Sequence, residues 1–483
     1  MKVEQIYSIL NTVTGEITGK TGLLREDLSN LSDLGTEVFG ASSVDNYVKS
    51  LVNHIGKVVF VDRVYNGSVP SIMMDSWEFG SVLQKVSCEI PDAVENESWE
   101  LENGKTYNPN IFYKPVVSSK FFNNKLTFEI NRSFTEMQVK ESFSSAEQMN
   151  GFLSMIQNSV EKSLTVKIDS LVMRTINRGI AETINQSIPD GLIGNISTPK
   201  AVNLLKLYND EYNKTLDAAH AMYDIDFIRY AAYVMMVTKE RMSKLSTLYN
   251  VGGKDRFTPA DSLHCVMLAD FRKTIDVFCK ASTFNESFVG VPDAELVPYW
   301  QGSGKNYSFN DISTIKVKLP TGTGTQTKDV NISGVLAIMF DNDAMGIANL
   351  SRRVTTNYNA KAEFYTNFYK FDAGYYIDLN ENIVVFYVAN GETGFKIDTT
   401  LAPSGTYTSA IIRGVEIDID SKTSIPSGIP VKLVISSPSA LSAKPVVKMN
   451  TSPQTVSDYD SENKRYTCDI SSVTANITVE SGT

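Results

Sequence analysis

The chain is poor in the residues that most often carry chemistry. Its 483 residues include three histidines (His54, His220 and His264) and four cysteines (Cys88, Cys265, Cys279 and Cys468). The histidines show no zinc-binding spacing, and the cysteines form no C-x-x-C pair. Cysteines scattered in this way are typical of reduced thiols, so the sequence predicts neither a metal site nor a disulfide.

Long apolar runs and basic clusters are also missing. The longest apolar run, Ala231–Val237, has seven residues, whereas a helix needs about twenty to span a bilayer. Met1–Gln5 does not begin the apolar core of a signal peptide. The net charge is −10 without a long basic run, which weighs against a nucleic-acid-binding enzyme. We therefore expect neither a membrane nor a specific nucleic-acid sequence as a partner.

Short motifs that could carry catalysis fail on spacing. Gly302–Lys305 is followed by Asn306, where a phosphate-binding loop needs serine or threonine. Asp341–Asp343 begins like a calcium loop, but Met345 stands where an oxygen ligand is needed, so a turn between a strand and a helix is expected. No G-x-S-x-G serine and no distinctive carboxylate pair occurs. We predict no catalytic residue, no cofactor, no metal and no enzymatic activity.

The strongest pattern in the chain is one very long amphipathic helix. Ser144 and Glu147 form a capping box at its start, and Pro189–Gly191 ends it. Apolar residues recur every three to four positions over roughly forty residues, which corresponds to about 60 Å of helix. These residues are Met149, Phe152, Leu153, Ile156, Val160, Leu164, Ile168, Leu171, Val172, Ile176, Ile180 and Ile184. A rod of this length suits a protein that tiles a surface better than a compact enzyme.

Strand-like segments precede the helix and lack the periodicity to close a core of their own. Short helical patches, around Val3–Leu10 and Arg25–Phe39, occupy residues 1–50. The predicted strands of a β-ribbon at 51–143 are Lys57–Tyr65, Gly80–Ile90, Ile111–Val117 and Leu126–Ile130. Its aromatic residues are the candidates for contact with another subunit: Trp77, Phe79, Trp99, Tyr107, Phe112 and Tyr113. Binding of sugar rings is the alternative role for them.

A mixed α/β region follows the helix. Thr198 with Pro199, then Asp226, then Thr258–Asp261 are predicted to open three helices, the last through about Lys280. The predicted strands of residues 200–397 are Ile315–Leu319, Gly334–Phe340, Phe364–Asp372, Tyr375–Leu379 and Ile383–Ala389. The last three are rich in tyrosine and phenylalanine, which is typical of aromatic pairs across antiparallel strands.

Composition changes abruptly near Asp398–Gly405. Residues 397–483 hold three aromatic residues, Tyr407, Tyr459 and Tyr466, out of 48 in the whole chain. Short strands are predicted at Gly414–Ile419, Val431–Ile435 and Ile477–Val479, which favours a β-sandwich. Tyr466 precedes Cys468 at the spacing of an immunoglobulin tyrosine corner, although residues 397–483 contain no second cysteine.

The order of these segments resembles the Hong Kong 97-like capsid fold of tailed bacteriophages. Ser50–Phe60 is similar to the start of the E-loop in phi-29-like podovirus major capsid proteins, and Val335–Asp343, Arg352 and Tyr365–Val388 resemble the end of their P-domain. The resemblance implies an α+β fold with a C-terminal all-β, immunoglobulin-like domain of the bacterial type. It divides the chain into an N-terminal arm (1–50), an E-loop β-ribbon (51–143), the P-domain spine helix (144–199), an A-domain (200–340), a P-domain sheet (341–397) and the immunoglobulin-like domain (398–483).

The same resemblance implies a function. It predicts a major capsid protein that self-assembles, as hexamers and pentamers, into the icosahedral or prolate head shell around phage DNA. It also implies a separate scaffolding protein and a portal protein as partners, assembly in the host bacterial cytoplasm and a final location in the virion. Some relatives cross-link their subunits through lysine and asparagine, but no such set stands out here. A phage tail, baseplate or surface adhesin with a glycan-binding β-sandwich is the alternative, and a glycoside hydrolase is a third.

Overall fold

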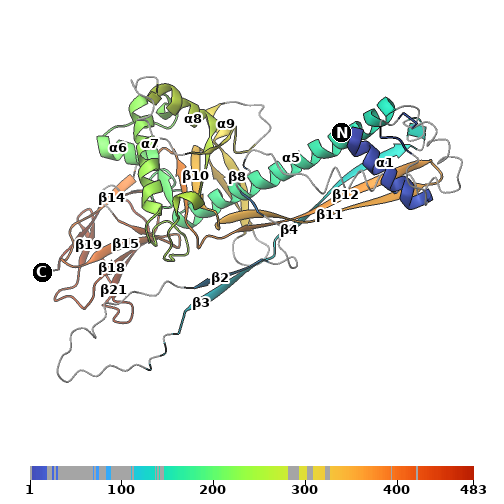
Figure 1. Cartoon of the computed structure of the whole chain (residues 1–483). Helices are drawn as coiled ribbons and strands as arrows, with labels where there is room; N and C mark the ends of the chain where they lie inside the picture. The colour runs from blue at the N-terminus through green and yellow to red at the C-terminus, as the bar shows by residue number, and fades with distance from the viewer. Residues whose placement is uncertain are drawn as a thin grey trace, which may run out of the picture. The chain divides into compact units, whose positions relative to one another are not determined.

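A computed structural model provides the structure of the chain (Figure 1). It describes residues 3–18, 24–26, 29–30, 50, 69, 72–74, 83–88, 110, 112, 114–135, 137–138, 141, 146–280, 293–301, 308–320, 327–392, 394–419 and 423–482. These residues form two compact units. The first unit comprises residues 1–172 and 346–376, and the second comprises residues 173–345 and 377–483.

The predicted long helix is confirmed. Helix α5 runs from Ala146 to Ser187 over 42 residues and contributes to both units. The apolar positions at three- to four-residue spacing are buried along it, among them Ile156, Val160 and Ile180. The helix ends because Pro189 lacks the N–H that the next helical hydrogen bond would need.

In the first unit, a four-stranded sheet has the order β1-β11-β12-β4. Its strands are β1 (Met73–Met74), β11 (Met345–Asn359), β12 (Phe364–Ile377) and β4 (Lys125–Thr135). The rings of Phe134 and Phe152 lie 5.6 Å apart and join β4 to α5. The predicted strands Phe364–Asp372 and Tyr375–Leu379 are one continuous strand, because β12 pairs with β4 without interruption from Phe364 to Gly374. Helix α1 (Val3–Thr18) also belongs to this unit.

In the second unit, a five-stranded sheet has the order β5-β13-β10-β6-β7. Its strands are β5 (Ala201–Asn203), β13 (Ile383–Tyr387), β10 (Val335–Asp341), β6 (Leu263–Leu268) and β7 (Glu295–Val297). Every residue of β10 and β13 is buried. Helices α6 (Leu204–Tyr212), α7 (Ile225–Met242), α8 (Ala269–Ile275) and α9 (Phe309–Ile312) also belong to this unit, together with the hairpin of β8 (Ile315–Pro320) and β9 (Thr327–Ile332).

Several predicted helix starts were wrong, because tertiary pairing overrode the local signals. Thr198 and Pro199 open no helix: β5 follows and pairs with β13, and Asn203 caps α6. Asp224, rather than Asp226, caps α7 by accepting a hydrogen bond from the Phe227 N–H. The predicted helix from Thr258 to Lys280 contains the buried strand β6, and α8 begins only at Ala269.

The turn at Asp341–Asp343 was also predicted wrongly. It joins two strands, β10 and β11, instead of a strand and a helix. One Asp341 carboxylate oxygen accepts from the Asp343 N–H at 2.9 Å, and the other accepts from the Thr258 hydroxyl at 2.7 Å. Asp341 therefore closes a tight turn through its own side chain.

Residues 394–482 form two sheets that share a buried apolar core. The first sheet has the order β17-β14-β22-β19-β20, and the second has the order β16-β15-β18-β21. The strands are β14 (Gly394–Leu401), β15 (Tyr407–Ile412), β16 (Val415–Asp418), β17 (Ser424–Pro426), β18 (Val431–Ser436), β19 (Val446–Met449), β20 (Ser452–Gln454), β21 (Arg465–Ile470) and β22 (Ile477–Glu480). Leu433, Val447, Cys468 and Val479 are completely buried between them.

These observations confirm a mixed α+β chain. Cys88, Cys265 and Cys468, the cysteines whose side chains the structure describes, form no disulfide. Among the helices that the structure describes, none is both long enough and apolar enough to cross a membrane.

Candidate functional site

A two-stranded ribbon in the first unit exposes an apolar face. Strand β2 (Leu83–Cys88) pairs antiparallel with β3 (Val117–Phe122), with Val86 opposite Ser119. Val86, Val117 and Phe121 share one face and are 60%, 55% and 61% exposed. A two-stranded ribbon is only marginally stable in water by itself. A row of exposed apolar side chains on such a ribbon indicates a contact surface.

The base of this ribbon is anchored, and its other face is polar. The ring of Phe122 is buried and lies 5.1 Å from the ring of Tyr376 at the end of β12. On the polar face, the hydroxyls of Ser87 and Ser118 form a hydrogen bond of 2.8 Å. The ribbon therefore combines a fixed base with one apolar face that is free to contact another surface.

The structure describes one of the six predicted contact residues. Phe112 precedes β3 and is 84% exposed. Outside the described residues lie the other five: Trp77, Phe79, Trp99, Tyr107 and Tyr113. The predicted set did not include Val86, Val117 and Phe121: the two valines are not aromatic, and Phe121 lies in β3, beyond Tyr113 at the end of the set. The apolar–polar–apolar order of Val86, Ser87 and Cys88 was a usable signal.

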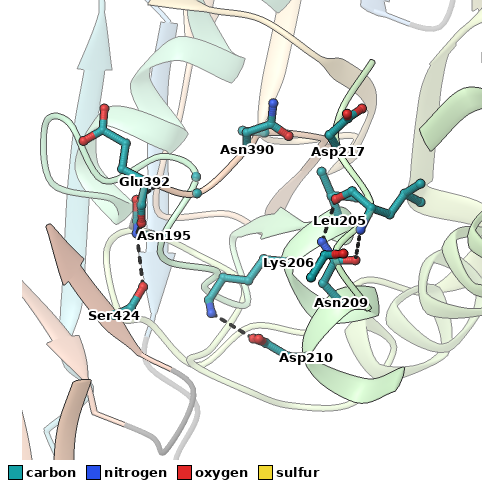
Figure 2. Close-up of a pocket in the computed structure, with 14 residues that line it drawn as sticks. Asn195, Leu205, Lys206, Asn209, Asp210, Asp217, Asn390, Glu392 and Ser424 are labelled. Carbon is teal, nitrogen blue, oxygen red and sulfur yellow. Dashed lines mark hydrogen bonds and ion pairs between the residues drawn. The ribbon is translucent and has the colours of Figure 1, made fainter. Parts of the chain in front are cut away.

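A polar pocket of about 390 Å³ lies in the second unit between α6 and the segment that follows β13 (Figure 2). Lys206 and Asp210 form an ion pair of 2.8 Å at its wall. The Asn209 amide donates to the Leu216 carbonyl at 2.8 Å and accepts from the Leu216 N–H at 3.0 Å. Because these polar groups already bond to each other, they hold the walls of the pocket together. We call this region, between α6 and the segment that follows β13, the joint.

Two asparagines at this joint bind the chain between β13 and β14. The Asn203 side chain donates to the Ala389 carbonyl at 3.0 Å and accepts from the Ala389 N–H at 3.3 Å. Asn195 does the same with Glu392, at 2.6 and 3.0 Å, and also donates to the Ser424 hydroxyl in β17 at 3.1 Å (Figure 2). Each side-chain amide forms with the backbone the pair of hydrogen bonds that a neighbouring strand would otherwise form. These hydrogen bonds therefore hold the connection to residues 394–482 in place.

The loop after α5 is held against the same joint. The Tyr387 hydroxyl donates to the Ile193 carbonyl at 2.9 Å. At Gly194, a Cβ atom would lie 1.8 Å from the Asn390 carbonyl oxygen. Only glycine fits here without moving the backbone.

The described histidines and thiols are not arranged for catalysis. His220 Nδ1 lies 2.7 Å from the Asp217 carboxylate, and His264 Nε2 lies 3.2 Å from the Asn342 amide oxygen. Burial raises the pKa of the Cys265 thiol to about 12 and that of Cys468 to about 11. Both thiols are thus protonated at neutral pH and are poor nucleophiles. Among the described residues, no three histidine, cysteine or acidic side chains gather at a metal-binding distance.

The structure combines an anchored ribbon that exposes an apolar face, a very long helix and a joint held by hydrogen bonds. These features define a structural protein that makes contacts through its surface. Comparison with known families gives the same class: the chain belongs to the Phi29-like phage major capsid proteins, whose family model matches residues 6–387. It is a protein of the phage head shell and is located in the virion. A comparison with curated protein sequences found no match.

Similar solved structures are capsids of tailed phages. The capsid of Staphylococcus phage Andhra is 11% identical with a TM-score of 0.43, over 68% of this chain and 86% of that chain. The capsid of Cyanophage P-SCSP1u is 12% identical with a TM-score of 0.39, over 66% and 87% of the two chains. The mature capsid of bacteriophage PhiM1 is 8% identical with a TM-score of 0.38, over 68% and 89%.

Proposed function

We propose that the chain adopts the Hong Kong 97-like fold and assembles, as hexamers and pentamers, into the icosahedral or prolate shell that encloses the phage DNA. In this proposal, residues 1–50 are the N-terminal arm, 51–143 the E-loop and 144–199 the spine helix. The A-domain is 200–340, and the P-domain sheet is 341–397. Membership of the capsid family supports the proposal over a tail, baseplate or adhesin protein.

The apolar face of the β2–β3 ribbon is the observation that carries the proposal. Val86, Val117 and Phe121 lie in solvent in the single chain. Burying them against a neighbouring subunit would remove the cost of exposing them to water. One such contact per subunit is weak, but the repetition of symmetric contacts closes a stable shell.

For residues 398–483 we propose a bacterial immunoglobulin-like domain. Two packed sheets, of five and four strands, support this assignment. Tyr466 departs from a tyrosine corner, because its hydroxyl accepts a hydrogen bond of 2.8 Å from the N–H of Leu441, which lies 25 residues earlier. The completely buried Cys468 takes an apolar core position in place of a disulfide.

A separate scaffolding protein and a portal protein complete the proposal as partners. Subunits that form both hexamers and pentamers need a template to select one shell size. A closed shell also needs an opening through which DNA can pass. Both partners are inferred from these needs of a shell and from the family.

The test of the proposal is assembly by purified variants, viewed by electron microscopy. The wild-type chain, expressed with the scaffolding protein of the same phage, should form shells or capsomers. Phe121→Ser should reduce shell yield at least tenfold without a change in the stability of the single chain. Leu401→Ser is the matched control, because Leu401 is 63% exposed and lies outside the ribbon. Unchanged shells from Phe121→Ser would remove the ribbon from the proposal, and a wild-type chain that stays monomeric would overturn the proposal itself.

A further inference from the structure

Tyrosines from two neighbouring helices line one groove in the second unit, named here the tyrosine groove. Helix α6 contributes Tyr208 and Tyr212, and α7 contributes Tyr230 and Tyr233. The two helices lie side by side (Figure 1). The groove has a volume of about 380 Å³, and sites for small molecules have volumes of about 300–1,000 Å³. The size of the groove therefore suits a small molecule.

Packing among the tyrosines holds the rings in position. Tyr208 is 2% exposed, and its ring lies 5.1 Å from that of Tyr212 and 5.6 Å from that of Tyr230. The rings of Tyr212 and Tyr230 are 5.7 Å apart and nearly perpendicular. Even so, Tyr212 is 55% exposed, and Tyr233 is 63% exposed. A ligand that packs on Tyr212 loses little free energy in ordering this ring, because its neighbours already hold it.

The charged side chains that line the tyrosine groove carry both signs. Lys214, Asp226 and Arg229 line it together. Spacings of three and four residues place Asp226, Arg229 and Tyr233 along the same side of α7. The carboxylate repels an anionic ligand, and the two basic groups repel a cationic one. The groove therefore favours a ligand that has no net charge but forms hydrogen bonds with both kinds of group.

A neutral saccharide meets these requirements. Sugar hydroxyls both donate and accept hydrogen bonds, so they can donate to the Asp226 carboxylate and accept from Lys214 and Arg229. The C–H face of a sugar ring is apolar and removes aromatic surface from water when it packs on a tyrosine. Burial, aided by the nearby Glu211 carboxylate, raises the pKa of Tyr230 to about 12. The Tyr230 hydroxyl therefore stays protonated and is able to donate as well as accept.

We propose that the tyrosine groove is a binding site for a neutral saccharide. The sugar ring packs on the exposed faces of Tyr212 and Tyr233, and its hydroxyls bond to the charged side chains of the groove. A nucleobase would stack on the same rings, but the phosphate attached to it would meet Asp226, so nucleic acid is the weaker match. Because the groove lies within one chain, the site does not depend on the proposed assembly.

Saturation-transfer NMR tests binding with two neutral probes, maltotriose and the trisaccharide of N-acetylglucosamine. Full-length, unassembled subunits should transfer saturation to the ring protons of at least one probe. Titration of that probe then gives the Kd for the comparison of variants. Transfer to neither probe would overturn the proposal.

Substitutions at Tyr233 locate the bound saccharide. Tyr233→Ser should weaken binding about tenfold, the loss expected when a stacked ring is removed. Tyr233→Phe keeps the ring and should retain most of the affinity. Tyr223→Ser is the matched control, because Tyr223 is 75% exposed and lies outside the described lining of the groove. Unchanged binding by Tyr233→Ser would place the saccharide elsewhere and also overturn the proposal.

Asp226→Asn gives a second reading that does not depend on the rings. It keeps the shape of the side chain but removes the charge, so the sugar hydroxyls lose a strong acceptor and binding should weaken severalfold. Its urea midpoint should stay close to that of the wild type. Asp270→Asn is the control, because Asp270 also lies in the first turn of a helix, α8, away from the lining of the groove. Equal weakening by both variants would show that the carboxylate does not contact the saccharide.

Hexathymidylate tests the competing class of ligand. We expect it not to displace the saccharide. If it binds more tightly than either trisaccharide, and Tyr233→Ser removes that binding, the groove takes nucleobases and the proposal is overturned. All these measurements use unassembled subunits, so a failure to form shells would count against the proposed function and leave the result for the groove unchanged.

Discussion

The Arg353 guanidinium in β11 donates a hydrogen bond of 2.6 Å to the Asp372 carboxylate in the neighbouring strand β12. The hydroxyl of Thr127 in β4 donates to the same carboxylate at 2.5 Å, and that of Ser351 donates at 2.7 Å. One carboxylate, 4% exposed, therefore joins three adjacent strands of the sheet. Buried charges are tolerated only when they are paired and hydrogen-bonded in this way.

Replacing Asp372 by asparagine should destabilise the first unit. The substitution keeps the shape but removes the charge, so Arg353 loses its ion pair and the hydroxyls lose a strong acceptor. We expect a loss of about 2 kcal/mol in the free energy of unfolding, measured by urea denaturation. Glu129→Gln is the matched control on β4, because Glu129 pairs with Lys370 at the surface at 3.1 Å. A control effect as large as that of Asp372→Asn would contradict this account.

Asp372 should also make stability depend on pH. Burial by itself would raise its pKa, but the hydrogen bonds from Arg353, Thr127 and Ser351 outweigh burial and hold the pKa well below its usual range. The stabilisation is therefore complete above the pKa of the unfolded chain, which is about 4. It is lost as the pH falls below that value, because protons then bind to the unfolded state first. The urea midpoint of the wild type should fall between about pH 5 and pH 3, and that of Asp372→Asn should fall less.

Sequence patterns predicted the elements that depend on residues close to one another along the chain. The helix α5 could be predicted because its apolar spacing is local. Strand β6 could not, since a short apolar run such as Leu263–Leu268 is compatible with a buried strand and with a helix. Strand β5 exists only because Ala201 pairs with Val385, a partner 184 residues away. The cluster at Asp372 has the same origin, because the partners of this β12 residue come from two other strands, β4 and β11.

Two glycines should respond in opposite ways to alanine. Gly194→Ala places a Cβ against the Asn390 carbonyl and should displace the loop after α5. We expect a loss of about 2 kcal/mol or more, in line with other close contacts that backbone must relieve. Gly151→Ala lies within α5, where nothing stands within 4 Å of the new methyl group, and should gain about 0.5–1 kcal/mol from helix propensity. Thermal denaturation of both variants and of the wild type measures these two changes in stability.

Asn195→Ala should loosen the joint before residues 394–482. The variant loses two bonds to the Glu392 backbone and one to Ser424, and Asn195 is 3% exposed. A loss of about 2 kcal/mol is expected, together with faster protease cleavage between residues 389 and 396. Asn463→Ala is the control, since the Asn463 amide bonds Asp460 in an exposed turn at 2.7 Å. Equal cleavage of wild type and Asn195→Ala would show that other contacts hold this joint.

The exposed apolar face of the β2–β3 ribbon, which we propose as the contact surface, was not predicted, for a physical reason. Exposed apolar residues in a single chain have no partner within that chain, so burial patterns do not reveal them in advance. The prediction selected Phe112, which is exposed, but left out Val86, which is not aromatic, and Phe121, which lies beyond Tyr113 at the end of the predicted set. The asparagines of the joint left no signal either, because Asn195 and Asn203 act on backbone that lies almost two hundred residues away.

The thiol of Cys88 should report assembly of the ribbon. Cys88 is exposed and occupies the same face of the ribbon as Val86 and Phe121. Iodoacetamide should therefore modify it readily in unassembled subunits and at least tenfold more slowly in shells, where the ribbon is covered. Cys265 and Cys468 are internal controls, because burial raises their pKa values and keeps both thiols protonated in either state. Mass spectrometry of the alkylated peptides measures each site, and equal modification of Cys88 in subunits and shells would mean that this face stays open after assembly.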